Sequence, residues 1–211
     1  MKGNLESLNE MQLDVFREIG NIGSGSAAAA LSKIVEKRIT LSLPRVKILK
    51  FNEITKVVGG EETQVLGVLQ PMQGDLTGNI MFLLGLKEAH DLASLLINRM
   101  LHISGRKTDL ESFEEMELSA LREISNIMIS SYLSAISALT NLKIMSAVPQ
   151  ISLDMAAAIL SVLAIEYGKI GDHVLYISSE FTQDNIKIGG DFFLVPEISS
   201  LGTLLKALGV G

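Results

Sequence analysis

The amino-acid sequence predicts an α+β fold with a pseudo-two-fold internal duplication. In this fold a shared, largely antiparallel sheet carries two long motif-bearing helices on one face. Two observations support the prediction. The spacing of apolar residues indicates helix, strand, strand pair and helix in that order, and the same order follows a second time. The sequence also aligns with itself at a constant offset, which indicates an internal repeat.

The first half of the chain begins with a long predicted helix. Ser7 and Glu10 have the spacing of a capping box, and strong helix formers without proline continue to about Arg38. Residues 38–49 alternate apolar and polar side chains and indicate a strand, with Pro44 at an edge or a bulge. The remaining elements of this half are a hairpin and a helix, at residues 63–73 with 76–84 and at residues 87–101.

The second half follows the same plan. Thr108 and Glu111 have capping-box spacing and predict a long helix that reaches about Leu139. Residues 141–152 are strand-like around Pro149. The elements that follow are a helix, a hairpin and a closing helix, at residues 154–165, at 173–182 with 186–195, and at 198–208.

The two halves match at an offset of 105 residues, which takes Asn21 to Asn126. The matched residues include two Arg-Glu-Ile triplets, two Asn-Ile pairs and two prolines, at 17–19 and 122–124, at 21–22 and 126–127, and at 44 and 149. We therefore expect one domain over residues 1–211, made of repeats at about 7–104 and about 108–211.

The composition excludes several classes of function. The 18 Lys and Arg residues are scattered and the formal net charge is −6, so the chain has no basic patch for nucleic acid. Because the chain has no cysteine, disulfides, thiolate catalysis and cysteine metal sites are excluded. The three histidines, His90, His102 and His173, lie far apart and lack the spacing of metal ligands.

Neither the N-terminus nor the most apolar run predicts export or insertion into a membrane. The first residues lack the apolar core of a signal peptide. The most apolar run, residues 155–165, is shorter than the roughly 20 residues that span a bilayer. We expect a cytoplasmic protein that does not insert into membranes.

Residues 23–28, GSGSAA, satisfy the glycine pattern of a dinucleotide-binding loop. Such a loop needs a strand immediately before its glycines and a helix that opens at them, because the helix N-terminus holds the pyrophosphate. Here the preceding residues are predicted to be helical, and the second copy of the repeat lacks the glycines. Nucleotide binding is therefore the weakest of the functional hypotheses.

Helical periodicity separates two faces of the first helix. The small and apolar residues share one face, which another helix can approach closely: Phe16, Gly20, Gly23, Ala27 and Ile34. Asp14, Glu18, Asn21 and Gly25 share the other face. Glycine inside a helix costs up to about 1 kcal/mol relative to alanine, so these glycines indicate close packing or room for a partner.

The polar face forms a stripe that both halves repeat. Asp14, Glu18 and Asn21 are separated by one i,i+4 and one i,i+3 step. The residues with the same geometry in the second half are Ser119, Glu123 and Asn126. A solvated helix surface would explain a single Glu and Asn. Asparagine is a weak helix former, however, and its recurrence in register beside glutamate favours a function.

The motif is Asp or Ser, three residues, Glu, two residues and Asn, followed by Pro after 22 further residues. Both halves satisfy it, at Asp14, Glu18, Asn21 and Pro44 and at Ser119, Glu123, Asn126 and Pro149. In this motif the chain resembles the CheC/CheX/FliY family of chemotaxis phosphatases over nearly its whole length. It is most similar to the CheC members, which carry two copies.

The resemblance implies a protein phosphatase that hydrolyses the aspartyl phosphate of the response regulator CheY. An acyl phosphate is already reactive, so the enzyme mainly has to place water in line with phosphorus, which an amide can do. Asn21 and Asn126 would orient that water, and Glu18 and Glu123 would pair with a lysine of the regulator. The residues expected to contact the regulator are Asp14 and Ser119. No cofactor of the chain's own is expected, because the magnesium ion belongs to the regulator.

A competing hypothesis is a non-catalytic binding module that docks on the response regulator or on the receptor deamidase CheD. The resemblance implies that CheD can bind, and residues 191–208 are a candidate surface, although a closing strand and helix explain that stretch better. The presence of Glu and Asn in both copies favours the enzyme.

Overall fold

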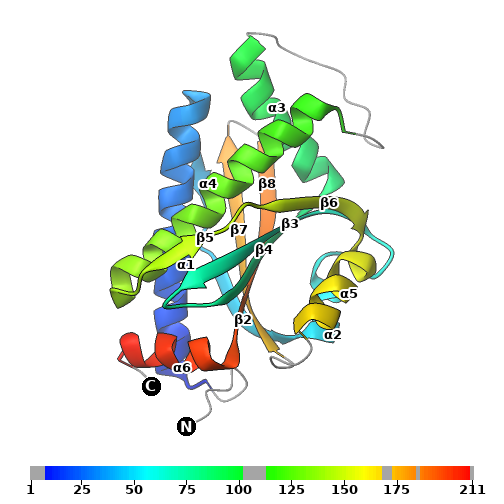
Figure 1. The fold of residues 1–211 in the computed structure, drawn as a ribbon. Coiled ribbons are helices and arrows are strands. Elements are labelled where there is room, and N and C mark those ends of the chain that lie inside the picture. The colour runs from blue at the N-terminus through cyan, green and yellow to red at the C-terminus, as the bar shows by residue number, and fades with distance from the viewer. Residues whose placement is uncertain (1–7, 102–112, 168–172, 184–185, 210–211) are drawn as a thin grey trace.

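The computed structural model describes residues 8–101, 113–167, 173–183 and 186–209. The first half forms α1 (Glu10–Val35), β1 (Thr40–Leu41), β2 (Arg45–Lys50), α2 (Phe51–Val57), β3 (Gln64–Gly74), β4 (Gly78–Gly85) and α3 (Leu86–Leu101). The second half forms α4 (Glu115–Thr140), β5 (Ile144–Ser146), β6 (Gln150–Met155), α5 (Ala156–Tyr167), β7 (His173–Gln183), β8 (Ile186–Pro196) and α6 (Ile198–Ala207). The order of helices and strands is thus the same in both halves (Figure 1).

The strands form one antiparallel sheet, in which each half adds a strand to the hairpin of the other. The order across the sheet is β1 and β2, then β7, β8, β4 and β3, then β5 and β6. β2 pairs with β7 and β6 pairs with β3, whereas β4 and β8 meet at the centre. The predicted α+β class and the shared antiparallel sheet are confirmed.

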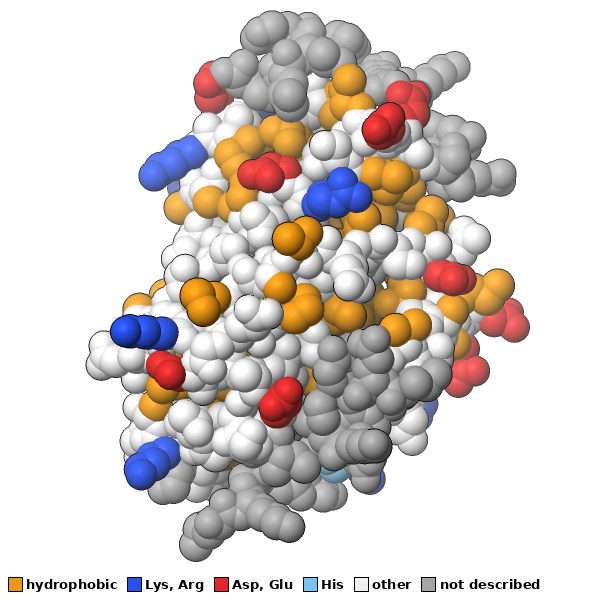
Figure 2. Space-filling view, viewed as in Figure 1, with side chains coloured by type: hydrophobic (Ala, Val, Ile, Leu, Met, Phe, Trp, Pro, Cys, Tyr) orange, Lys and Arg blue, Asp and Glu red, His pale blue; other side chains and the backbone are white. Residues whose placement is uncertain are grey.

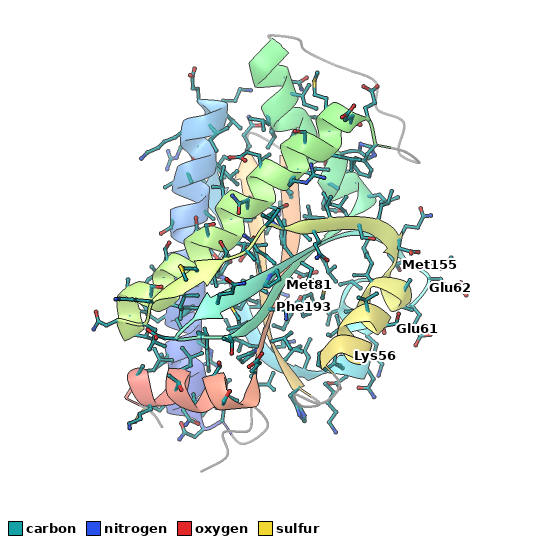
Figure 3. The ribbon with its side chains drawn as sticks, in the orientation of Figure 1. Lys56, Glu61, Glu62, Met81, Met155 and Phe193 are labelled. Atoms are coloured by element: carbon teal, nitrogen blue, oxygen red, sulfur yellow. The ribbon has the colours of Figure 1, made fainter. Side chains whose placement is uncertain are left out.

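Helices cover both faces of this sheet. α1, α3, α4 and α6 pack over one face, on a core that includes Phe82 and Phe192. α2 and α5 cover the other face, where Met81 of β4 lies opposite Phe193 of β8 (Figure 3). Because successive strand residues point to opposite faces, both central strands carry apolar side chains on both sides. The two long helices, α1 and α4, lie against each other on one face, as predicted.

Both long helices begin later than the predicted capping boxes. The cap of α1 is Asn9, whose side chain accepts from Gln12 N at 2.9 Å while Gln12 Oε1 accepts from Asn9 N at 2.8 Å. At α4, Glu117 accepts from the backbone N–H of Glu114 at 2.9 Å. The caps therefore lie two residues beyond the predicted Ser7 at α1 (9 − 7) and six residues beyond the predicted Thr108 at α4 (114 − 108), which shifts each start. Ser7, Thr108 and Glu111 lie outside the described residues.

Two further differences have local causes. The strand predicted at residues 38–49 is divided into β1 and β2 just before and after Pro44, which has no N–H to donate. The register with β7 also shifts by one residue there, since Thr40 lies opposite Thr182 and Arg45 opposite Ser178. The helix α2 was not predicted, because seven residues are too few to establish a helical period.

A buried polar pair fixes α3 to the start of α4. His90 and Glu117 are 2% and 3% exposed, and His90 Nδ1 lies 3.5 Å from Glu117 Oε1. The His90 ring also stacks on Phe113, with ring centroids 3.9 Å apart. His90 is therefore a core residue that contributes to helix packing.

Candidate functional site

The polar stripe of α1 lies on the surface. Asp14, Glu18 and Asn21 are all exposed, as helical periodicity predicted. Asp14 is held by an ion pair with Arg17, which also lies 3.7 Å from Glu10. Among the described residues, Glu18 and Asn21 have no side-chain hydrogen bond or ion pair, so both side chains are available to a partner.

The glycines of α1 have different surroundings on its two faces. A Cβ on Gly23 would lie 2.6 Å from the ring of Tyr132 and 3.1 Å from its Cα, so the helices touch there almost backbone to backbone. A Cβ on Gly20 would lie 3.3 Å from Pro44 Cγ. A Cβ on Gly25 would meet nothing within 4 Å. Close helix packing is thus confirmed at Gly23, whereas Gly25 leaves open surface beside the stripe.

The stripe of α4 is less uniform. Ser119 and Glu123 are exposed, but Asn126 is half-buried. Its Oδ1 accepts a hydrogen bond from Gln70 Nε2 at 3.0 Å, and the same nitrogen donates to the carbonyl of Ala147 at 2.9 Å. The structure therefore shows two stripes of matching sequence in which Asn126 has a side-chain hydrogen bond and Asn21 has none among the described residues.

Three buried hydroxyl groups lie beneath the crossing of α1 and α4. Ser24, Tyr132 and Ser179 are each bonded to the other two: Ser24 Oγ contacts Tyr132 OH, and Ser179 Oγ lies 2.9 Å from Ser24 Oγ and 2.7 Å from Tyr132 OH. Burial raises the pKa of Tyr132. This cluster joins both helices to β7 and fixes the backbones that carry the two stripes.

Each stripe is flanked by an exposed apolar residue in the loop before its motif proline. Leu43 precedes Pro44 and is 85% exposed, and Val148 precedes Pro149 and is 80% exposed. They are the two most exposed large apolar side chains among the described residues. Pro44 lies against Gly20, next to Asn21 in the chain, and Ala147 shares the Gln70 amide with Asn126. The second loop therefore lies beside Asn126, and the first loop packs against α1 one residue before Asn21.

A groove of about 340 Å³ adjoins the second stripe. It runs between α4 and the end of α3, and Ser119 and Glu123 line it together with Arg122 and Leu96. On the face made by α1 and α4, hydrophobic, acidic and basic side chains are interspersed (Figure 2). This surface therefore offers both charge and apolar area to a partner.

A second cavity of about 400 Å³ opens on the α2 side of the sheet. Its polar wall contains Glu88, Tyr176 and Asp191, and Tyr176 donates from its hydroxyl to Asp191 Oδ1 at 2.8 Å. Burial raises the pKa of Asp191, and burial likewise raises the pKa of Tyr176 to about 12. This cavity contains none of the residues of either stripe.

Other predictions about the site have mixed outcomes. Residues 23–28 lie inside α1 with helix before and after them, so they cannot form a phosphate loop at a helix start. Within the described ranges, no three acidic or histidine side chains gather to hold a metal ion. None of the described helices is long and apolar enough to cross a membrane. Residues 191–208 contain the end of β8 and the whole of α6, much of whose apolar surface is buried. That the chain has no cofactor of its own stays a prediction.

Sequence reasoning did not find Gln70 or the Ser24–Tyr132–Ser179 cluster. Gln70 lies on β3, 56 residues before Asn126, and nothing in its local pattern marks it as a neighbour of the motif. β3 pairs with β5 at residues 72–74 and with β6 at residues 64–69. These two pairings place the loop before Pro149 beside Gln70.

Comparisons with known proteins agree with this picture. The model of the CheC-like family matches residues 11–48 and again residues 116–153. CheY-P phosphatase CheC of Bacillus subtilis is 34% identical over 206 residues, which are 96% of this chain and 96% of that protein. Flagellar motor switch phosphatase FliY of the same organism is 28% identical over 149 residues, 71% of this chain and 37% of FliY.

A solved structure shows the same fold. The X-ray structure of Thermotoga maritima FliY superimposes with a TM-score of 0.75 at 21% identity and covers 96% of this chain and 98% of that one. The matched segments of the family model contain both Glu–Asn pairs, and the similarity to CheC runs over nearly the whole sequence. The chain is therefore a member of the CheC-like family.

Proposed function

We propose that this protein hydrolyses the aspartyl phosphate of a phosphorylated CheY-type chemotaxis response regulator. The observation that carries the proposal is the presentation of two Glu-x-x-Asn pairs on the outer faces of two long, crossing helices. Glu18, Asn21 and Glu123 have no side-chain partner among the described residues. The relative named for this activity matches 96% of the chain.

The proposed mechanism assigns one task to each side chain. Glu18 and Glu123 pair with a lysine beside the phosphorylated aspartate of the regulator, which aligns the helix with that site. Asn21 and Asn126 orient a water molecule in line with the phosphorus. The amide both donates and accepts, so it can fix the water without acting as a strong base. Magnesium, bound by the regulator, would neutralise charge on the phosphoryl oxygens.

The side chains that precede the Glu–Asn pairs contribute contacts in this proposal. Asp14 and Ser119 lie one helical turn before the glutamates and are exposed. Asp14 is shared with Arg17, so at the first site the regulator meets an ion pair rather than a lone carboxylate. The bare backbone at Gly25 leaves room for the regulator on the other side of Asn21.

The test is the decay of aspartyl phosphate on a cognate regulator, with wild type, Asn21→Ala, Asn126→Ala and the double variant. We expect wild type to accelerate the decay and the double variant to leave it at the rate of the regulator alone. Asn52→Ala is the matched control, because Asn52 is exposed on α2, on the other face of the sheet, and should keep full activity. If wild type binds the regulator without changing the decay, the non-catalytic binding module replaces the phosphatase.

A further inference from the structure

We propose that Gln70 is a positioning residue for Asn126, and that it makes the second Glu–Asn site better ordered than the first. The inference rests on the proposed phosphatase function. It concerns one buried strand residue that lies outside both sequence motifs and reaches one of the two asparagines.

Gln70 lies at the middle of β3 and is 0% exposed. Both hydrogens of its amide nitrogen are used, one on Asn126 Oδ1 at 3.0 Å and one on the carbonyl of Ala147 at 2.9 Å. Ala147 is in turn fixed to β3, because its N–H donates to the carbonyl of Pro71 at 2.9 Å. One side chain therefore connects the strand, the loop before Val148 and the asparagine of the helix.

This hydrogen bond leaves Asn126 able to act on water. A carbonyl oxygen has two lone pairs, and Gln70 occupies one of them. The second lone pair and both Nδ2 hydrogens remain for the water and the regulator. Because the amide is already oriented, docking does not have to restrict its rotation, and groups held in a reactive geometry lower the barrier.

The first site has no equivalent of this hydrogen bond. The N–H of Ser42 donates to the carbonyl of Glu180 at 3.0 Å, just as the N–H of Ala147 donates to Pro71. These matching bonds place Ser179, the residue before Glu180, where Gln70 stands before Pro71.

Ser179 does not reach the first asparagine. Its hydroxyl is bonded to Ser24 and Tyr132 beneath the helix crossing. Asn21 is exposed and has no side-chain hydrogen bond among the described residues. The two sites share Glu and Asn, but only Asn126 is held before a partner arrives.

Stability alone does not account for glutamine at position 70. Its Oε1 is buried and has no hydrogen-bond partner among the described residues. An unpaired buried polar atom destabilises the folded state, whereas an apolar side chain would fill the same place without that cost. Gln70 has this unpaired oxygen and donates both of its amide hydrogens at the site, which fits a positioning role.

The experiment measures Gln70→Met in two single-site backgrounds. Methionine has a similar length but cannot donate. With Asn21→Ala, only the second site remains, and we expect Gln70→Met to lower the maximal rate of aspartyl-phosphate loss about tenfold. The half-saturating regulator concentration should not change, because Glu123 still docks. A tenfold loss corresponds to about 1.4 kcal/mol, the size of one hydrogen bond.

With Asn126→Ala, only the first site remains, and Gln70→Met should leave its rate unchanged. An equal loss in both backgrounds would mean that methionine damages the fold, and this would overturn the positioning role. An unchanged rate in the Asn21→Ala background would overturn it as well. If wild type does not accelerate the decay at all, the proposed function fails together with the catalytic consequence of Gln70.

A second readout separates these failures. The side-chain Nδ2 protons of Asn126 give an NMR signal that Asn126→Ala identifies by its loss. Gln70→Met should shift this signal and leave that of Asn21 in place. If the Asn126 signal does not respond to Gln70→Met, Gln70 does not hold Asn126 in solution, whatever the phosphatase assay shows.

Discussion

Gly23 and Gly25 lie two residues apart in α1 and have opposite surroundings. At Gly23, a methyl group would overlap the Tyr132 ring at 2.6 Å and press on the α4 backbone at 3.1 Å. We expect Gly23→Ala to lower the free energy of unfolding by about 1–3 kcal/mol, because the two helices would have to separate. Denaturant unfolding measures this loss.

Gly25→Ala is the control. Because nothing lies within 4 Å of the added methyl group, helix propensity should raise the free energy of unfolding by up to about 1 kcal/mol. The same methyl group should weaken regulator binding if Gly25 gives a docking partner room. If Gly23→Ala is as stable as Gly25→Ala, the close contact between α1 and α4 does not exist in solution.

Asp191, which belongs to neither stripe, makes the free energy of unfolding depend on pH. Burial raises its pKa in the folded protein above the ordinary value, so the ionised carboxylate opposes folding at neutral pH. This penalty is lost as the pH falls through the folded pKa toward the ordinary value of about 4. Asp191→Asn keeps an acceptor for Tyr176 and should therefore raise the free energy of unfolding at pH 7.

The gain from Asp191→Asn should disappear at or below pH 4, where wild type is also neutral at this position. Urea unfolding of both proteins at pH 7 and pH 4 measures the difference. Tyr176→Phe serves as a control for the hydrogen bond that both proteins share. A change of equal size at both pH values would show that ionisation of Asp191 does not affect stability, and a loss at pH 7 larger than at pH 4 would show that hydrogen bonds to the carboxylate outweigh its burial.

At the scale of elements, the loops between β1 and β2 and between β5 and β6 offer apolar contacts beside each site. Leu43 and Val148 are 85% and 80% exposed, so replacing either with serine should leave stability unchanged. In the proposed function both residues touch the regulator. Losing a buried leucine or valine contact costs about 1–2 kcal/mol, which predicts a half-saturating regulator concentration roughly tenfold higher.

Single-site backgrounds assign each loop to its stripe. Leu43→Ser should raise the half-saturating regulator concentration in the Asn126→Ala background. Val148→Ser should raise it in the Asn21→Ala background. Val57→Ser, at an exposed position of α2 on the other face, is the control that should leave the half-saturating concentration unchanged in both backgrounds. If both loop variants keep the wild-type half-saturating concentration, the loops are not part of the docking surface.

Sequence patterns predicted the elements whose signal is long and local. α1, α4 and the two hairpins extend over enough residues for their apolar period to be clear, and helical spacing alone placed Glu18 and Asn21 on one exposed stripe. The seven-residue α2 is too short to show a period, and helix starts depend on which of several nearby polar residues forms the cap. The Gln70–Asn126 bond depends on strand register between the two halves, which no local pattern encodes.

At the scale of the whole molecule, the exchange of strands links the two halves. Without the second half, β1 and β2 lose their partner β7, and β3 loses β5 and β6. α1 also loses its packing against α4. The division into repeats at about 7–104 and about 108–211 stays a prediction, but the pairing shows what each repeat would lack.

We expect fragments 1–107 and 108–211 to show no cooperative unfolding when separate and to form a folded complex when mixed. A single hairpin from the described strands cannot bury its apolar faces alone. Circular dichroism during heating tests cooperativity, and gel filtration tests association. A sigmoidal transition from either fragment alone would show that a repeat is an independent domain.

The same duplication within one chain has a consequence for divergence between the sites. In a symmetric dimer of identical subunits, any substitution appears twice, so both sites always change together. Here, one gene encodes two copies of the motif at separate positions. Glutamine can therefore stand on β3 while serine stands at the matching place on β7. Because the two copies occupy separate positions of one chain, a substitution can change one half alone. A rigid site and an adaptable one can therefore coexist in a single molecule.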